Sequence, residues 1–527
     1  MQYRPEIDGL RALAVLPVIL FHAGFELFSG GFIGVDVFFV ISGYLITTII
    51  ISEMAEDKFS IINFYDRRAR RILPALFFVM AACIPFAWLW LTPTDLKDFG
   101  QSLVAVSSFS SNILFWMESG YFDEAAELKP LLHTWSLAVE EQYYILFPIL
   151  LIFTWKLGLK WILILLSIVF LISLGLAQWS AYNYPSAAFY ILPTRAWELL
   201  VGVFAAFYLN YNTHLKSYSA NQLLSLIGFG MVFYSIIVFD KTIPFPSLYT
   251  LIPTIGTGLL ILCTVPKTLI YKLLSLKLIV GIGLISYSAY LWHQPLLAFA
   301  RYRALGEVSD LTIIILCITS LVMAWFSWKY VEQPFRDKKT FTTNKIFLFS
   351  IIGIGVFFSV GISFHINKGY AERVNFTEEL SNSFERLSAD NCFAIPFNHS
   401  AKTWGCTLGK TTGDIDFILF GDSHSVSLKS LIDDIGKKRE IRIFFTGASA
   451  CLPFIGIYPN RNDQYKNNCN LLNDRVYQFA KDNKVKGIIL SARWSNYTLG
   501  DYNFSGDVLI SDMVDGPFTL QHSIGTF

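Results

Sequence analysis

The chain has 527 residues, of which 54% are hydrophobic and only 15% charged, and its mean hydropathy is +0.49. Soluble globular proteins carry about 25% charged residues, so this composition excludes an ordinary soluble protein. The formal net charge of +1 gives no electrostatic reason to expect a nucleic acid partner. The apolar residues are concentrated before residue 367, where many runs reach the roughly 20 residues that span a bilayer core.

Eleven apolar segments in this region are candidate membrane helices, because a helix satisfies its own backbone polar groups and can therefore cross lipid. They cover residues 10–28, 33–53, 74–94, 136–155, 161–178, 194–210, 223–239, 248–265, 279–299, 311–330 and 346–366. The first apolar stretch carries Asp8, Arg11 and His22 and shows no small-residue cleavage site. We therefore expect a retained helix rather than a signal peptide.

Lysine and arginine are distributed unevenly over the connecting segments. With the N-terminus inside, 18 of them fall on inside segments and 5 on outside loops. Cytoplasmic loops carry an excess of Lys and Arg, so the N-terminus is expected in the cytoplasm. Eleven crossings then place residue 367 onward on the outer side.

Ionisable residues within the apolar segments are candidate functional groups. Arg11 and His22 share the first helix, about three turns apart, and Asp36 opens the second. The fourth and ninth helices add His133, Glu140, Glu141 and His293. An isolated histidine is more often a satisfied core residue, but burying so many unpaired groups is costly. We therefore expect these side chains to line a shared polar cavity.

A dense basic stretch, RRARRILPA at residues 67–75, is predicted to be a loop that leads into the third helix. It either determines topology and contacts anionic lipid or forms an anion site on the cytoplasmic face. Arginine suits phosphates, and the phosphate-rich acyl donor of the cytoplasm is an acyl-CoA. The candidate donor-binding residues are Arg67, Arg68, Arg70 and Arg71.

The chain after residue 367 has a different character. A linker at 367–390 precedes short β-rich runs at 416–420, 441–445 and 487–490, with helical patterns between them at 427–438 and 471–483. Alternating strands and helices favour a parallel α/β sheet.

Four of the seven cysteines follow the last apolar segment: Cys392, Cys406, Cys451 and Cys469. In an oxidising compartment they would form two disulfides. Nearest neighbours would pair 392 with 406 and 451 with 469, which is one of three possible pairings. The quartet lacks the paired CxxC spacing of zinc sites, so no metal is expected. Cys83, Cys263 and Cys317 lie in apolar segments and are expected to be packing residues.

Six segments in the first 340 residues together resemble the acyltransferase-3 family of bacterial membrane proteins. They are YRPEIDGLRALAVLPVILFHA, GGFIGVDVFFVISGYLIT, NFYDRRARRILPA, LLHTWSLAVEEQYYILFP, YSAYLWHQPL and KYVEQPFR. The resemblance implies ten membrane helices that transfer acetyl or similar groups onto glycans, peptidoglycan, lipids or small secreted products. The family's Arg-x10-His motif matches Arg11 and His22, and its basic motif matches residues 67–71.

The tail resembles SGNH hydrolases. IDFILFGDSHS at 415–425 is similar to their first block and implies that Ser423 is a nucleophile. TGASACLP at 446–453 and SARWSNY at 491–497 are similar to later blocks and imply Gly447 and Asn496 as oxyanion donors. The family's Asp-x-x-His pair, which supplies the base, does not occur after residue 497. We therefore expect an incomplete SGNH domain.

The expected architecture is a polytopic α-helical membrane bundle of about ten plus one helices, followed by a flavodoxin-like α/β domain. Its parts are an acyltransferase domain at 1–340, an eleventh helix and linker at 341–390, and a partial periplasmic SGNH-like domain at 391–527. The expected location is the bacterial inner membrane, in contact with lipid.

The resemblance implies an O-acyltransferase that moves acetyl from acetyl-CoA to a hydroxyl of a lipid-linked or surface glycan, such as O-antigen. His22 would be the general base, oriented by Arg11 or Asp36, and Ser423 would relay the acetyl group unless the outer domain only holds the glycan. Two alternatives are a transporter of a small solute or glycan precursor and a membrane-anchored glycan esterase.

Overall fold

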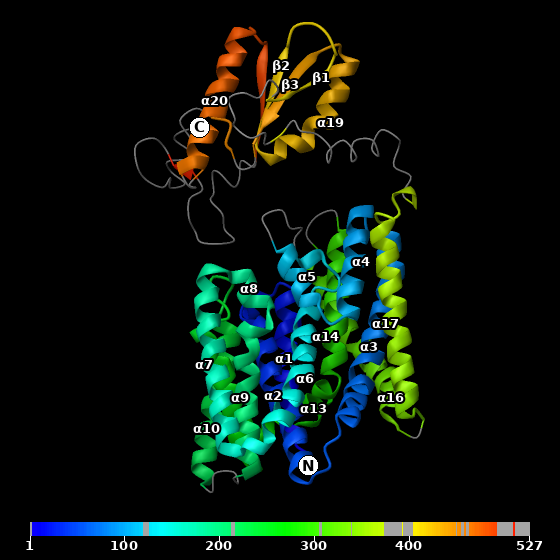
Figure 1. Cartoon of the computed structure of the whole chain (residues 1–527), viewed down its shortest axis with the longest axis vertical. Helices are drawn as coiled ribbons and strands as arrows, with labels where there is room; N and C mark the ends of the chain where they lie inside the picture. Colours follow the sequence, from blue (N-terminus) through cyan, green and yellow to red (C-terminus); the bar gives the residue numbers. More distant parts are fainter. Residues whose placement is uncertain are drawn as a thin grey trace. The chain divides into compact units, whose positions relative to one another are not determined.

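The computed structural model describes residues 3–119, 126–211, 217–304, 308–338, 340–373, 393, 404–448, 451–454, 458–459, 463–492 and 510–511. The chain divides into two compact units, Met1–Val374 and Asn375–Phe527 (Figure 1). The expected linker at 367–390 lies largely outside the described residues.

The described part of the first unit is helical. Its α-helices are α1 (Pro5–His22), α2 (Gly34–Ala55), α3 (Ile61–Trp90), α4 (Pro93–Ser107), α5 (Ser111–Glu118), α6 (Thr134–Thr154), α7 (Leu159–Asn183), α8 (Pro185–Tyr190), α9 (Leu192–Tyr211), α10 (Tyr218–Val238), α11 (Leu251–Cys263), α12 (Leu269–Leu274), α13 (Lys277–Leu284), α14 (Ser286–Arg303), α15 (Asp310–Ser327), α16 (Gln333–Arg336) and α17 (Thr343–Ile366). The N-terminus and α16 lie at one end of the bundle, and α4, α5 and α8 lie toward the other (Figure 1).

Each of the eleven expected segments coincides with helix, and eight helical segments among the described residues are long and apolar enough to cross a membrane. The other three differ for simple reasons. α1 carries Glu6, Asp8 and Arg11 within 18 residues, α11 has only 13 residues, and the expected helix at 279–299 is divided at Ile285 into α13 and α14. The helices that the sequence did not predict are α4, α5, α8, α12 and α16.

Burial separates central from peripheral helices. In the apolar window of Gly31–Ala55, 72% of the residues are buried, against 17% in Leu159–Asn183 and Asp310–Arg336. Helix α2 is therefore central, while α7 and α15 present apolar side chains outward, as lipid-facing helices do. The expected eleventh helix, α17, packs on α3 and α4 and belongs to the first unit.

The basic stretch at 67–71 is helical rather than a loop, which corrects the expectation for the third helix. Helix α3 begins at Ile61 because the Ser60 side chain accepts a hydrogen bond from the Asn63 amide, as an N-cap does. Arginine is also a good helix former. The four arginines therefore project from successive positions of one helix, and their spacing decides what each one contacts.

The second unit contains β1 (Cys406–Gly409), β2 (Phe417–Gly421), α19 (Ser423–Lys438), β3 (Arg442–Gly447), β4 (Tyr458–Pro459), α20 (Asp463–Asp482), β5 (Gly487–Ser491) and β6 (Ile510–Ser511). Four strands form a sheet in the order β1-β3-β2-β5, in which β2 is parallel to β3 and β5 but β1 is antiparallel to β3. The sheet is therefore mixed, whereas the sequence predicts a parallel sheet. β1 directly precedes β2 in the chain without a crossover helix, so it joins the edge as an antiparallel strand.

Alternate side chains of the central strands are buried against different helices. Ile418 and Phe420 share a cluster with Leu472 and Val476 of α20. Leu419 and Phe445 pack with apolar side chains of α19. Helices therefore cover both faces of the sheet, and the carboxyl ends of β2, β3 and β5 meet at one edge.

Candidate functional site

The membrane unit contains a cavity of about 430 Å³ enclosed by α1, α2, α3, α6 and α14. Contacts between these helices give it a direction. Gly283, just before α14, lies against Asp8, and Arg301 of α14 donates to the His22 carbonyl, so α14 runs parallel to α1. Arg4 contacts Tyr44 and Gly34 lies against Ala14, so α2 runs antiparallel. The cavity begins near the start of α1 and ends before His22.

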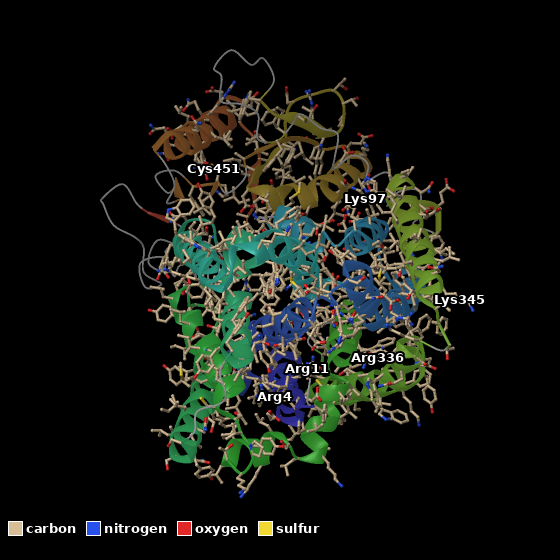
Figure 2. All side chains as sticks on the ribbon, turned by 60° about the horizontal axis from the view of Figure 1, so that its bottom comes forward. Arg4, Arg11, Lys97, Arg336, Lys345 and Cys451 are labelled. Atoms are coloured by element: carbon tan, nitrogen blue, oxygen red, sulfur yellow. A yellow bond between two sulfur atoms is a disulfide. The ribbon has the colours of Figure 1, made fainter. Side chains whose placement is uncertain are left out.

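Four arginines surround the cavity toward the start of α1. They are Arg4, Arg11, Arg68 and Arg71. Two carboxylates accompany them: Asp8 accepts from Arg11 at 2.8 Å, and Glu140 accepts from the Tyr144 hydroxyl at 2.7 Å. The lining is therefore net positive at this end. Figure 2 labels Arg4, which directly precedes α1, and Arg11, which lies within α1.

The structure separates the four arginines of α3 into two pairs. Arg68 and Arg71 line the cavity. Arg67 instead pairs with Glu53 at 3.0 Å, and Arg70 is buried against Asp66 at 2.9 Å and donates to the Phe335 carbonyl. Of the four candidate donor-binding arginines, two therefore line the cavity and two tie helices together.

Neither cavity-facing arginine of α3 is neutralised by an ion pair among the described residues. Arg68 stacks over the Tyr144 ring at 5.8 Å, and its buried Nε atom has no hydrogen-bond partner within the described chain. Arg71 lies close enough to Arg11 and Arg68 to repel both electrostatically. Clustered guanidinium groups without carboxylate partners fit a phosphate-bearing ligand.

Tyr290 is the lining residue of the cavity whose ring lies beside the histidines. Phe38 and Ser136 line the cavity next to it. The Tyr290 hydroxyl lies 2.7 Å from Ser136 Oγ and donates to the His133 carbonyl at 2.9 Å. Tyr290 thus forms both the wall of the cavity and a contact to the histidines beyond it.

Three histidines gather beyond this wall. The ring centroid of His293 lies 5.1 Å from that of His22 and 5.5 Å from that of His133. The Tyr290 ring lies 5.3 Å from His293 and 5.4 Å from His133. The expected grouping of histidines from the first, fourth and ninth segments is therefore present, but next to the cavity rather than in its lining. Among the described residues, no set of three His, Cys, Asp or Glu side chains is arranged to hold a metal ion.

Hydrogen bonds assign the tautomers of the two closest histidines. His293 Nδ1 lies 2.6 Å from the Tyr290 carbonyl, and His22 Nδ1 lies 3.0 Å from the Val18 carbonyl. A carbonyl only accepts, so both Nδ1 atoms carry hydrogen. His293 Nε2 is then an acceptor 3.3 Å from His22 Nδ1. The Nε2 atom of neutral His22 keeps its lone pair and can act as a base.

Asp36 lies in a different polar cluster from His22. It is fully buried and accepts from Arg195 at 2.8 Å, and Arg195 also donates to Glu198 at 2.9 Å. Helices α2 and α9 approach closely here, since a Cβ on Gly202 would overlap the Val40 carbonyl oxygen. Asp36 is therefore corrected from an orienting partner of His22 to part of an ion-paired contact between α2 and α9.

Two other residues also differ from what the sequence predicts for them. Arg11 lines the cavity and pairs with Asp8, so it does not hold the His22 ring. Glu140 lines the cavity, whereas Glu141, one position further along α6, is buried outside the lining. Residues one apart on a helix point about 100° from each other, and Glu141 is the one of the two that points away from the cavity.

In the second unit, Ser423 begins α19 directly after β2. Asp422 caps this helix by accepting from the His424 amide at 2.8 Å, and the His424 ring lies 3.2 Å from the same carboxylate oxygen. Gly447 ends β3 next to Gly421 in register. A Cβ on Gly447 would overlap the Gly421 carbonyl oxygen, so only glycine fits there. The two glycines therefore bring the serine turn and the end of β3 together.

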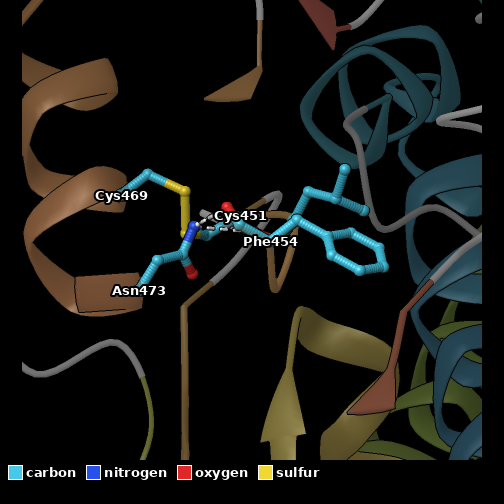
Figure 3. Close-up of a disulfide and its surroundings, with 5 residues drawn as sticks. Cys451, Phe454, Cys469 and Asn473 are labelled. Atoms are coloured by element: carbon cyan, nitrogen blue, oxygen red, sulfur yellow. Dashed lines mark hydrogen bonds between the residues drawn. A yellow bond between two sulfur atoms is a disulfide. The ribbon is translucent and has the colours of Figure 1, made fainter. Parts of the chain in front are cut away.

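Asn496, the third expected SGNH residue, lies outside the described residues. Cys451 and Cys469 form a disulfide that joins the segment after β3 to α20 (Figure 3). Asn473, one turn along α20, donates to the Leu452 and Phe454 carbonyls and holds the same segment. Cys406 is also disulfide-bonded, while Cys392 lies outside the described residues.

The first unit is thus a multi-pass membrane bundle with a basic cavity beside a histidine cluster, and the second is an α/β unit with a serine at the end of a central strand. Residues 4–332 match the acyltransferase domain family, and residues 391–521 match the SGNH domain that is fused to such domains. The chain belongs to the acyltransferase-3 family and carries a fused SGNH domain.

Two relatives illustrate the similarity. The chain is 34% identical over 352 residues to the O-acetyltransferase OatA of Staphylococcus aureus (strain NCTC 8325 / PS 47), covering 64% of this chain and 58% of that protein. It is 32% identical over 390 residues to the peptidoglycan O-acetyltransferase OatA of Listeria monocytogenes serovar 1/2a, covering 68% of this chain and 61% of that protein. The chain thus spans about three fifths of the length of these relatives. No solved structure matches.

Proposed function

We propose that this protein is a membrane O-acetyltransferase that moves an acetyl group from acetyl-CoA to a hydroxyl of a cell-envelope glycan. The observation that carries the proposal is the arginine-lined cavity directly beside the His22–His293 pair. Family membership and the names of the relatives, both O-acetyltransferases, support the same reaction class.

Acetyl-CoA is the donor in this proposal. Arg68 and Arg71 are the groups best suited to its phosphates, because neither forms an ion pair within the described chain and Arg68 has an unpartnered buried Nε. Arg4 and Arg11 add positive charge to the same end. The cavity volume falls in the range of small-molecule sites, about 300–1,000 Å³, and would hold part of a molecule as large as CoA.

His22 is the proposed general base. Its Nε2 lone pair takes the proton of the attacking hydroxyl while that oxygen bonds to the acetyl carbon. The C–S bond of the thioester then breaks, and the thiolate leaves and takes up a proton. His293 is the proposed positioning residue, because its Nε2 fixes the Nδ1–H tautomer of His22 together with the Val18 carbonyl.

The proposed orientation puts the N-terminus in the cytoplasm and the SGNH unit outside. Two observations support this orientation. Eighteen Lys and Arg residues fall on the segments assigned to the inside and 5 on those assigned to the outside, and the disulfide of the second unit suits an oxidising compartment. The arginine end of the cavity then faces the compartment that contains acetyl-CoA, and the histidines lie toward the outer surface.

The SGNH unit has a proposed part in delivery. Ser423 starts a helix, and the partial positive charge of a helix N-terminus would stabilise an oxyanion formed at that serine. We infer that Ser423 carries the acetyl group as an ester, and that a glycan hydroxyl then bonds to the acetyl carbon while the serine C–O bond breaks and the serine oxygen takes up the proton that the glycan hydroxyl gave up. Mass spectrometry of protein quenched during turnover tests this, since it would find an acetyl group on the peptide that contains Ser423.

The acceptor is proposed only as a class: a hydroxyl of a surface or wall glycan. The O-antigen suggested by the sequence and the peptidoglycan named for the Listeria relative both belong to it. NMR of both glycans from cells with and without the gene identifies the acetylated sugar.

Reconstituted protein with labelled acetyl-CoA tests the reaction itself. Label recovered in base-labile ester linkage on added glycan supports an acetyltransferase. Label taken up into vesicles without covalent transfer supports a transporter instead and overturns the proposal.

A further inference from the structure

The cavity is lined by arginines and by an uncharged wall that adjoins the histidines. Phe38 and Ser136 line the cavity and contact Tyr290, whose ring lies beside the histidines. A thioester with phosphates at one end and an acyl group at the other therefore has one favourable direction of entry. Its acyl group would lie against Phe38 and Tyr290.

Phe38 is well placed to limit the room at this end. It is partly exposed within the cavity, although its neighbours Val37 and Phe39 in α2 are fully buried. The ring centroids of Phe38 and Tyr290 lie 6.4 Å apart, so the two rings form a continuous wall. The Tyr290 hydroxyl donates to the His133 carbonyl and shares a hydrogen bond with the Ser136 hydroxyl, and these two contacts hold the second ring. Phe38 has no polar atom and acts through its size alone.

We propose that Phe38 is a specificity-determining residue that limits the transferred group to acetyl by filling the space a longer acyl chain would need. This inference rests on the proposed function, because it assigns one wall of the same donor cavity. The reaction is otherwise unchanged: the acceptor oxygen bonds to the acyl carbon, the C–S bond breaks, and the thiol leaves with the proton that the hydroxyl gave up.

The test is a competition between acyl-CoA thioesters. Membranes containing the full chain receive acetyl-, propionyl- and butyryl-CoA in equal amounts, and the base-labile acyl groups on the glycan are identified by mass. Each methylene in an apolar pocket changes discrimination by about tenfold or more. Phe38→Ala should therefore raise the propionyl-to-acetyl ratio by about tenfold, and Phe38→Leu should raise it by less.

Phe39→Ala is the matched control. It removes the same side chain from the next position of α2, where the ring packs on Trp135 and does not line the cavity. The ratio should stay as in the wild type. Because a ratio does not depend on the amount of folded protein, partial misfolding of a variant does not obscure the result.

Two results would overturn the inference while leaving the proposed function intact. One is acetyl transfer by Phe38→Ala and Phe38→Leu with the wild-type ratio. The other is an equal shift in Phe39→Ala. A wild-type protein that transfers no acyl group from any of the three thioesters would overturn the proposed function, and this inference with it.

Discussion

His293 Nε2 lies 3.3 Å from His22 Nδ1, so two histidines 271 residues apart in sequence share a hydrogen bond at the C-terminal end of α1. Neighbouring backbone carbonyls fix both tautomers, and the lone pair of His22 Nε2 remains free. Arg11, eleven residues earlier on the same helix, lines the arginine end of the cavity. One helix therefore connects the proposed donor site with the proposed base.

Arg71→Ala should raise the KM for acetyl-CoA with less effect on kcat, because a charge-assisted contact to phosphate contributes about 1.5–3 kcal/mol to binding. This corresponds to roughly a 10- to 150-fold change. Arg67→Ala is the matched control, since it removes the same side chain from the same helix but breaks only a half-exposed pair with Glu53. Steady-state kinetics at varied acetyl-CoA concentration would measure both. Equal effects of the two variants would mean that residues 67–71 only determine the membrane topology.

Arg195→Met should destabilise the membrane unit by about 3–5 kcal/mol, because it leaves two buried carboxylates without their partner. Asp36 and Glu198 are both fully buried and both accept from this guanidinium. Thermal unfolding of purified protein measures the loss. The triple variant Asp36→Asn, Arg195→Met, Glu198→Gln removes the charges together and should recover much of it. No recovery would mean that Arg195 stabilises the unit mainly through its cation–π contacts with the rings of Trp135, Phe189 and Phe245.

The variants Lys97→Cys and Lys345→Cys should react with a maleimide from opposite sides of the membrane. Lys97 lies in α4, whose Gly100 meets Gly361 near the end of α17, while Lys345 lies in the first turn of α17 (Figure 2). A helix of 24 residues spans about 36 Å. In a background without Cys83, Cys263 and Cys317, an impermeant maleimide added to intact cells should label Lys97→Cys and not Lys345→Cys. The reverse pattern would invert the proposed orientation.

The helices could be predicted from the sequence because continuous apolar runs have few other stable structures in lipid. The strand–turn–helix around Ser423 was equally clear, since β2 and α19 match the predicted alternation closely. The contact between Asp36 and Arg195 could not be predicted in the same way. It joins positions 159 residues apart, and the helix pairing that creates it is a property of packing.

The separation of the four arginines had a readable signal. Ser60 is a typical N-cap, and a helix counted from there puts Arg67 with Arg70 and Arg68 with Arg71 on two neighbouring faces, because each pair is three residues apart. A loop at residues 67–71, as predicted, would have no such helical spacing. The role of Tyr290 left no such signal, because its hydroxyl contacts Ser136 and His133, which lie about 155 residues earlier in the chain.

The role of His22 as the base for acetyl transfer is tested most directly by the His22→Gln variant at matched membrane abundance. Glutamine keeps a hydrogen-bonding side chain but has no basic nitrogen. We predict that transfer of labelled acetyl from acetyl-CoA to glycan falls about 10²- to 10⁴-fold, the usual contribution of general base catalysis. The KM for acetyl-CoA should stay near the wild-type value, because His22 is not among the residues that line the donor cavity. Wild-type transfer by His22→Gln would contradict the account.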